Sequence, residues 1–236
     1  MKRYQHQLIL SEIGKKGQNE VSKASVLIVG AGGLGSIAAG YLTAMGVSNL
    51  GICDFDVVEE SNLHRQFFYT PQDVGLNKAN LLAQKLQIQN PHINIKSFTD
   101  KVDESNVESL FSDYQIVCDC SDNVATRLLV NDNCSTQRLP LVHGAVSEWQ
   151  GYISVFHYKQ QYTYADLFAR HDLLNHQSCS INGISSPICG IVGSYMANEV
   201  IKVILKSEFV MEGKILYING LNNLTRYLRL KKTNII

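Results

Sequence analysis

The feature that most constrains this chain is a four-residue apolar run, Val26 to Val29, followed at once by the glycine-rich stretch Gly30 to Gly35. A run rich in valine and isoleucine predicts a strand buried on both faces of a parallel sheet. The small residues from Ser36 to Ala44 predict a helix packed tightly on that sheet. In such a strand–turn–helix unit, the free amides at the helix N-terminus point at a phosphate. The alternative is a glycine turn that binds no ligand.

A second apolar run, Leu50 to Cys53, predicts a strand that ends at Asp54. An acidic residue at this place in a nucleotide-binding unit accepts hydrogen bonds from ribose hydroxyls. Together with Gly30, Gly32 and Gly35, which fit the G-x-G-x-x-G pattern of the glycine loop, Asp54 predicts a nucleotide site. The loop leaves the nucleotide open, because dinucleotide oxidoreductases and ATP-using enzymes both begin in this way.

Composition excludes several classes of protein. Lysine and arginine together number 21, as do aspartate and glutamate, so no overall charge attracts the chain to nucleic acid or to a membrane. No apolar run approaches the roughly 20 residues of a membrane helix, and the N-terminus lacks the apolar core of a signal peptide. The six cysteines form no C-x-x-C pair, which favours buried free thiols. We therefore expect a cytoplasmic protein.

The rest of the chain predicts one α/β domain over residues 1–236. Strand-like and helix-like segments alternate up to about residue 142, and later strands follow each other directly, so we expect a Rossmann-like, mostly parallel sheet with helices on both faces, continued by antiparallel strands. Short helices within 4–24 are expected outside the first strand, as a cap on the sheet, a lid or a dimer arm. The other expected strands are 93–98, 115–120, 140–145, 151–158, 214–219 and 224–230, and the other expected helices are 75–89, 107–111, 124–138 and 190–205.

Three polar residues after Asp54 are candidates for binding phosphate. Asn62 can donate an amide hydrogen bond, and Arg65 can hold a phosphate with its planar guanidinium. Lys78 begins a predicted helix, where the helix dipole disfavours a cation unless it faces a bound anion. The alternative for all three is a solvated surface position.

Asp122 follows another predicted strand, next to Asn123. A carboxylate at the end of a parallel strand can hold Mg²⁺, which is typically bound through one or two carboxylates. The alternative is that Asp122 caps the helix expected from Val124 onward. The sequence leaves these two roles open.

With these motifs in place, the chain resembles, over nearly its whole length, the bacterial adenylyltransferases of the MoeB/ThiF/HesA type, which activate ubiquitin-like sulfur-carrier proteins. The order of GAGGLG, SNLxRQ and DCxDN is specific to that family. The matching stretches are Arg3-Tyr4, Val26 to Gly35, Asp54 to Val58, Ser61 to Gln66, Gly75 with Lys78, Asn90 to His92, Asp119 to Asn123 with Arg127, Pro187 to Ser194, and Glu199 to Lys202.

The resemblance implies ATP and Mg²⁺ as the nucleotide and metal, and homodimers as the assembly. The partner it implies is a small ubiquitin-like carrier ending in Gly-Gly, of the type used in thiamine or molybdopterin biosynthesis, together with a sulfur-donor protein. The carrier's C-terminal carboxylate attacks the α-phosphate of ATP, giving an acyl-adenylate and pyrophosphate. The family's nucleotide-binding residues correspond to Gly30, Gly32, Gly33, Asp54, Asn62, Arg65, Lys78, Asp122 and Asn123.

The chain departs from the family pattern at three places. His6 stands where the family has an arginine that reaches the phosphates of the neighbouring subunit, so we expect a weaker phosphate contact made in trans. The two C-x-x-C pairs that hold zinc in the family are missing, so we expect no zinc site. Cys179 stands near the family's cysteine and is a candidate persulfide or thioester thiol, with an incidental loop cysteine as the alternative.

Three other functions remain open at this point. The chain resembles the family in chemistry, so its substrate could also be a carboxylate on a peptide or on tRNA, although no basic stripe favours tRNA. The changed residue at position 6 and the missing zinc ligands are compatible with a catalytically weak partner subunit. An NAD-dependent oxidoreductase is supported by the glycine loop alone.

Overall fold

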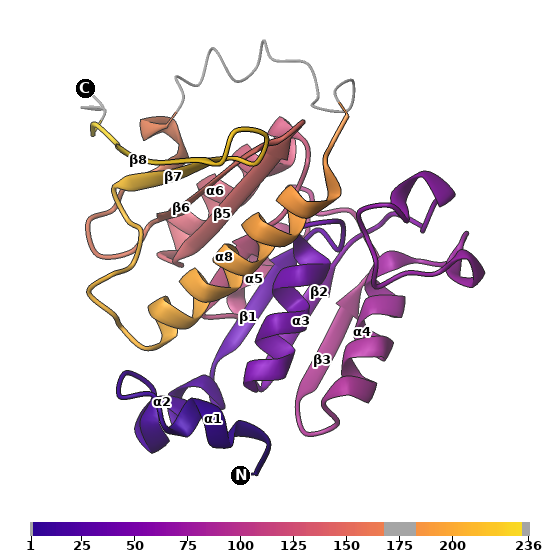
Figure 1. Ribbon diagram of the computed structural model, residues 1–236, viewed down its shortest axis with the longest axis horizontal. Helices are drawn as coiled ribbons and strands as arrows, with labels where there is room; N and C mark the ends of the chain where they lie inside the picture. The colour runs from indigo at the N-terminus through magenta and orange to yellow at the C-terminus, as the bar shows by residue number, and fades with distance from the viewer. Residues whose placement is uncertain (1, 168–182, 233–236) are drawn as a thin grey trace.

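The computed structural model describes residues 2–167 and 183–232, and in this part of the chain the strands form an eight-stranded mixed sheet (Figure 1). The strand order is β3-β2-β1-β4-β5-β6-β7-β8. Neighbours from β3 to β5 in this order are parallel, and those from β5 to β8 are antiparallel. The predicted parallel sheet with an antiparallel continuation is confirmed. The strands are β1 (Ser25–Val29), β2 (Asn49–Cys53), β3 (Asn94–Phe98), β4 (Ile116–Asp119), β5 (Leu141–Ser147), β6 (Gln150–Phe156), β7 (Lys214–Asn219) and β8 (Leu224–Arg229).

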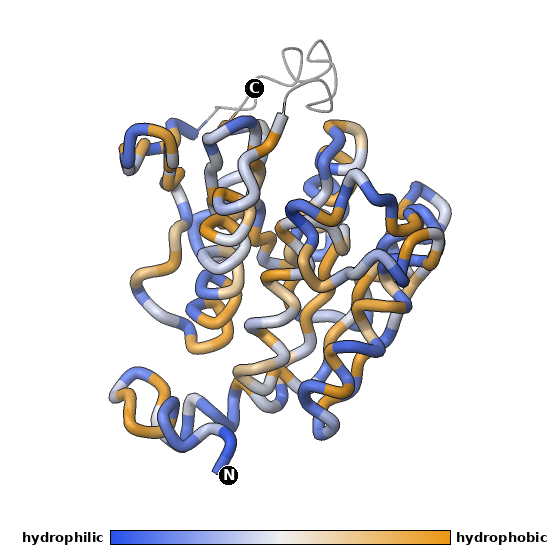
Figure 2. The backbone as a smooth tube through the Cα atoms, turned by 45° about the vertical axis from the view of Figure 1, so that its right-hand side comes forward, coloured by the Kyte–Doolittle hydropathy of each residue, from blue (hydrophilic) through white to orange (hydrophobic). Residues whose placement is uncertain are grey.

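Helices cover both faces of the sheet, because the inner strands are apolar on both sides. In β1, Val26 and Ile28 pack in one hydrophobic cluster with α3, α4 and α8, whereas Leu27 packs in a second cluster with α5 and α6. Figure 2 shows the central strands as largely hydrophobic. No helix in the described residues is long and apolar enough to cross a membrane. The helices of the two faces are α3 (Gly35–Met45), α4 (Lys78–Gln89), α5 (Val107–Ser112), α6 (Val124–Gln137) and α8 (Ser186–Ile204).

The N-terminal segment lies at the end of the sheet away from the glycine loop (Figure 1). It contains η1 (Lys2–Tyr4), α1 (Gln5–Leu8) and α2 (Gly14–Val21). The Gln7 side chain donates to the carbonyl of Met45, the last residue of α3, at 3.3 Å. Since α3 begins at the glycine loop and rises about 1.5 Å per residue, α1 is separated from that loop by the length of the helix.

The chain order of the strands creates a switch point between β1 and β4. From β1 the chain moves outward through β2 to β3, and then returns to β4 on the other side of β1. In open parallel sheets, ligands bind at the carboxyl ends of the strands at such a point. Residues that follow β1, β2 and β4 therefore meet at one edge.

Short 3-10 helices lie on the connections between these elements, at η2 (Glu60–Asn62), η3 (Pro71–Asp73) and η4 (Tyr164–Asp166).

Candidate functional site

The glycine loop after β1 is shaped by contacts that leave no room for side chains. Gly30 has a φ of +97°, and a Cβ there would lie 2.9 Å from the carbonyl oxygen of Cys120. A Cβ on Gly35 would lie 1.8 Å from the carbonyl oxygen of Gly30. These positions must be glycine for the loop to turn sharply and start α3 where it does. The helix N-terminus consequently opens onto the edge where β1 and β4 end.

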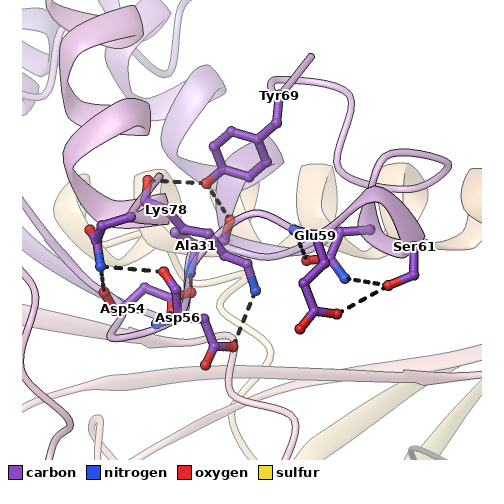
Figure 3. A network of polar contacts seen from close by, with 9 residues as sticks. Ala31, Asp54, Asp56, Glu59, Ser61, Tyr69 and Lys78 are labelled. Carbon is purple, nitrogen blue, oxygen red and sulfur yellow. Dashed lines mark hydrogen bonds and ion pairs between the residues drawn. The ribbon is translucent and has the colours of Figure 1, made fainter. Parts of the chain in front are cut away.

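Asp54 fixes the loop from the adjacent strand (Figure 3). One carboxylate oxygen accepts the amide N–H of Ala31 at 2.7 Å, and the other accepts the amide N–H of Asp56 at 2.9 Å. Burial raises the pKa of Asp54, while these two amide hydrogen bonds act in the opposite direction. Each oxygen still has a further acceptor site, which is what a ribose hydroxyl requires.

Tyr69 joins the loop to the start of α4, and the sequence analysis did not find it. Its hydroxyl lies 2.8 Å from the carbonyl oxygen of Ala31 and 3.2 Å from that of Lys78 (Figure 3). Burial raises the pKa of Tyr69, so the hydroxyl keeps its proton and acts as a donor. An aromatic residue after a polar turn gives no signal in the sequence that distinguishes this role from ordinary packing.

Lys78 is the first residue of α4 and is 6% exposed. Its Nζ donates to a carboxylate oxygen of Asp56 at 3.1 Å (Figure 3), and the Asp56 side chain is half exposed. This partner explains how a buried lysine is tolerated at a helix N-terminus. An ammonium group has three donors, so Lys78 can keep Asp56 and still contact an anion. The solvated position considered as an alternative is wrong, since the side chain is buried.

Arg65 and Asn62 lie on the turn after β2. The guanidinium of Arg65 donates to the carbonyl oxygen of Ser61 at 3.1 Å and lies 3.0 Å from Nε2 of His64. Both contacts use the same nitrogen, Nη1, which leaves other donors of the guanidinium for a ligand. Asn62 is 7% exposed, and its side-chain oxygen accepts the amide N–H of Glu59 at 3.4 Å.

The capping role that the sequence left open for Asp122 belongs to its neighbour Asn123. Asn123 is the N-cap of α6, and its side-chain oxygen accepts the amide N–H of Thr126 at 2.9 Å. Asp122 is exposed and does not cap the helix. Its carboxylate therefore remains accessible at the end of β4, as a metal ligand requires.

One cavity of about 540 Å³ brings these residues together. A volume of this size lies in the range of small-molecule and cofactor sites. Its wall includes every residue that the sequence analysis assigned to the nucleotide, namely Gly30, Gly32, Gly33, Asp54, Asn62, Arg65, Lys78, Asp122 and Asn123. The residues come from the ends of β1, β2 and β4 and from the start of α4.

Two candidates from the sequence remain, His6 and Cys179. His6 is exposed in α1 and does not line the cavity of its own chain. Cys179 lies outside the described residues. Within residues 2–167 and 183–232, no group of three histidine, cysteine, aspartate or glutamate side chains is arranged to hold a metal ion. The described cysteines are all free and buried, as expected.

A buried pair of titratable residues beneath the site was not predicted from the sequence. Nδ1 of His143 lies 2.8 Å from a carboxylate oxygen of Asp119, and the other oxygen accepts the amide N–H of Ser121 at 3.0 Å. Asp119 ends β4 and is paired in register with His143 of β5. The signal was the position of an aspartate and a histidine on neighbouring parallel strands, which becomes informative only when the register is known. The pair holds the turn that carries Asp122.

This pair predicts a dependence of stability on pH. Burial lowers the pKa of His143, although Asp119 opposes the shift. Burial by itself would raise the pKa of Asp119, but the hydrogen bond with His143 and the charge of Arg127 outweigh it and the pKa is lowered. As the pH falls, His143 and Asp119 therefore bind protons more readily in the unfolded chain than in the folded protein. The unfolded chain takes up protons at the histidine below about pH 6.5 and at the aspartate below about pH 3.9.

We expect the free energy of unfolding to fall as the pH is lowered from about 7 to about 5. The variant His143→Asn keeps a donor near Asp119 but cannot titrate, so it should be less stable at neutral pH and show a flatter profile over this range. Urea unfolding at several pH values measures both quantities. If the free energy of unfolding fell equally with decreasing pH in both proteins, His143 would not be the cause of the loss of stability in acid.

Comparison with known proteins identifies the family of the chain. Residues 4–235 match the ThiF family. The chain is 41% identical over 232 residues to "Adenylyltransferase and sulfurtransferase MOCS3" of Caenorhabditis briggsae, covering 98% of this chain and 58% of the relative. It is 37% identical to "Probable molybdopterin-synthase adenylyltransferase" of Gracilaria tenuistipitata var. liui, covering 99% of this chain and 66% of the relative.

Among solved structures, Escherichia coli MccB with ATP has the same fold. The TM-score is 0.85 at 19% identity, covering 99% of this chain and 73% of MccB. The chain thus spans between about half and two thirds of the length of the curated relatives. The expected resemblance is confirmed, since the match covers nearly all of this chain at more than a third identity to these relatives. This chain belongs to the ThiF family.

Proposed function

We propose that this chain, acting as a single domain, is an ATP-dependent adenylyltransferase that activates the C-terminal carboxylate of a small ubiquitin-like sulfur-carrier protein ending in Gly-Gly. The observation that carries this proposal is the single cavity lined by every predicted nucleotide-binding residue. The names of the relatives, which describe adenylyltransferases and a molybdopterin-synthase adenylyltransferase, support the same activity and a ThiS- or MoaD-type carrier. A cytoplasmic location and a separate sulfur-donor protein belong to the same proposal.

In the proposed reaction, a carboxylate oxygen of the carrier bonds to the α-phosphorus of ATP. The bond from that phosphorus to the bridging oxygen breaks, and pyrophosphate leaves with both electrons of that bond. Two anions repel each other as they approach, so the site must supply positive charge. Arg65 and Lys78 line the cavity and have donors left for phosphate oxygens. Positioning and charge neutralisation carry this step without a covalent protein intermediate.

Asp122 fits the ligand set of Mg²⁺. The metal is commonly held by one or two carboxylates together with substrate phosphates, and Asp122 supplies an exposed carboxylate in the wall of the cavity. When bound, the metal ion would neutralise phosphate charge and polarise the reacting phosphoryl group. Asp119 and Asn123 support Asp122 by holding the turn on either side of it.

The test of this function is ATP–pyrophosphate exchange in the presence of a Gly-Gly carrier of the MoaD or ThiS type. We expect exchange with the intact carrier and none with the same carrier lacking its last glycine. Short peptides with a free C-terminus serve as the competing substrate class. Exchange that runs equally well with such peptides would redirect the proposal to a peptide substrate, and no exchange with either would favour a catalytically weak partner subunit.

A homodimer in which His6 contacts the neighbouring subunit's nucleotide is part of the proposal. It is supported by the position of α1, which lies at the far end of α3 from the cavity of its own chain. His6 therefore has no route to that cavity within one subunit. A histidine in trans would donate a hydrogen bond to phosphate, with full charge only when protonated.

Mixing two impaired variants tests this arrangement. In a dimer of His6→Ala with Lys78→Ala, one site has the normal Lys78 and receives the normal His6 from its neighbour. We expect an equal mixture to regain up to about a quarter of the wild-type exchange if subunits exchange freely, because about half of the dimers are then mixed and one of the two sites in each mixed dimer is complete. If His6 acted within its own subunit, each site would carry one defect and no activity would return. A monomer in solution would exclude the arrangement altogether.

A further inference from the structure

The last strand, β8, leaves one edge of the sheet open. It pairs with β7 alone and ends the strand order (Figure 1). The amide N–H of Leu230 donates to the carbonyl of Gly213 at 3.0 Å. Because hydrogen-bonded and non-hydrogen-bonded pairs alternate along an antiparallel ladder, the amide and carbonyl groups of Thr225, Tyr227 and Arg229 point away from β7. In the part of the chain that the structure describes, no backbone group pairs with them.

The open edge is also basic. Residues 213–232 contain five lysines and arginines and no aspartate or glutamate, although the whole chain has 21 of each kind. Arg226 and Arg229 lie on β8, are exposed, and form no ion pair with a described residue. Apolar surface lies beside them, since Tyr227 is 64% and Leu228 is 49% exposed. The edge therefore combines free backbone groups, positive charge and apolar surface.

The charge of this edge distinguishes between possible partners. A free strand edge pairs readily with another strand, and charged side chains oppose pairing with an unsuitable one. A second copy of β8 would place four arginines on one short ladder, where like charges are destabilising. A strand with acidic side chains would instead meet Arg226 and Arg229 with opposite charges. In strand addition of this kind, main-chain hydrogen bonds supply affinity and side chains supply specificity, so the edge favours an acidic partner strand.

A row of paired residues connects this edge with the cavity. Val146 of β5 lines the cavity and pairs with Gly151 of β6. Gly151 pairs with Ile218 of β7, and Ile218 pairs with Thr225 of β8. Neighbouring strands lie about 4.8 Å apart, so a ninth strand beside β8 would lie about 19 Å from β5. Six extended residues span about 20 Å, so the C-terminal tail of a protein docked at this edge can reach the cavity.

We propose that the free edge of β8 is the docking site for the folded part of the carrier protein, which adds a strand with acidic side chains to the sheet. This inference rests on the proposed function, because it takes the carrier as the partner whose C-terminal tail enters the cavity. The docking site is separate from the nucleotide. Changes on β8 therefore weaken binding of the carrier and leave binding of ATP as it is.

The double variant Arg226→Glu/Arg229→Glu tests the charge of the edge. Its matched control, Lys23→Glu/Lys96→Glu, reverses two exposed cations elsewhere, of which Lys96 lies on β3 at the opposite edge of the sheet. ATP–pyrophosphate exchange with a MoaD- or ThiS-type carrier gives kcat and the KM values for carrier and for ATP. We expect the β8 variant to raise KM for the carrier at least about fivefold, as suits the reversal of two charges in an interface, with kcat and KM for ATP close to wild type. The control should match wild type in all three.

Proline at position 227 tests the backbone contact. Because the N–H of Tyr227 points outward, Tyr227→Pro removes a donor of the free edge without removing a hydrogen bond to β7. Tyr227→Ala is the control, since it removes the same side chain and keeps the N–H. We expect Tyr227→Pro to raise KM for the carrier at least about threefold above that of Tyr227→Ala, as suits the loss of one hydrogen bond. Thermal unfolding shows whether both variants are folded, and if the proline variant is not, the arginine variant decides alone.

A wild-type KM for the carrier in Arg226→Glu/Arg229→Glu would overturn the docking site and leave the proposed function intact. An equal rise in KM in the control would do the same, because the effect would then come from overall charge. A shift between dimer and monomer in the β8 variant would assign the edge to a second copy of this chain. If the wild-type protein showed no exchange with either type of carrier, the proposed function would fall, and this inference with it.

Discussion

Replacing Lys78 or Arg65 with alanine is expected to lower ATP–pyrophosphate exchange by at least about tenfold each, which corresponds to about 1.4 kcal/mol of lost transition-state stabilisation. The reason is that each side chain supplies a cation to the wall of the cavity where two anions must meet. Lys78 should have the larger effect on stability, since its removal also leaves Asp56 without its partner. Initial exchange rates at saturating carrier give the measurement.

Lys96→Ala is the matched control for the lysine variant. Lys96 lies on β3, is mostly exposed and pairs with Asp113 at 3.8 Å, outside the cavity. A surface pair of this kind contributes little to stability. We expect wild-type exchange from this variant. Unchanged exchange in both Lys78→Ala and Arg65→Ala would refute their assignment to the phosphates.

Asp122→Asn is expected to abolish the Mg²⁺-dependent part of the exchange while leaving stability nearly unchanged. The substitution keeps the shape of the side chain but removes the charge that a magnesium ion requires. The carboxylate is exposed and does not cap α6, so the fold does not depend on it. Exchange measured across a Mg²⁺ titration, together with urea unfolding, separates the two effects.

Asn123, the residue next to Asp122, is expected to affect stability and not the dependence on Mg²⁺. Asn123→Ala removes the N-cap of α6 and should cost about 1 kcal/mol of stability. If Asp122→Asn lost stability to the same extent and kept its metal dependence, Asp122 would be a structural residue of the turn. The two variants together decide which of the adjacent side chains serves the helix and which the metal.

Much of the fold was predictable because its strands are short apolar runs that need no tertiary context to be recognised. Val26 to Val29 and Leu50 to Cys53 lie within β1 and β2. The ends of the helices were predicted less accurately than the strands. The helix expected from residue 75 begins at Lys78 and is capped by Asn77. Asn77 differs little from its polar neighbours in sequence, and its capping bond to Asn80 exists only once the helix is formed.

The nucleotide-binding residues were predictable for a different reason, namely that their motifs lie at strand ends that a parallel sheet brings to one edge. Contacts between residues distant in sequence were not predictable in this way. The pairing of Lys78 with Asp56 and of Asp119 with His143 depends on where loops fold back and on strand register. The burial of Gln66 likewise depends on its approach to the glycine loop. Such features emerge only from the three-dimensional structure, because residue type alone does not determine which partner a side chain contacts.

Detection of the acyl-adenylate shows directly whether this protein is an adenylyltransferase for a carrier protein. The protein is incubated with ATP, Mg²⁺ and a Gly-Gly carrier, quenched in acid and examined by intact-protein mass spectrometry. We expect one adenylate on the C-terminal glycine of the carrier, one pyrophosphate released for each, and at least about tenfold less of both products with Lys78→Ala. ATP consumed without an adenylate on the carrier, or an adenylate found only on this chain, would contradict the proposed adenylation of the carrier.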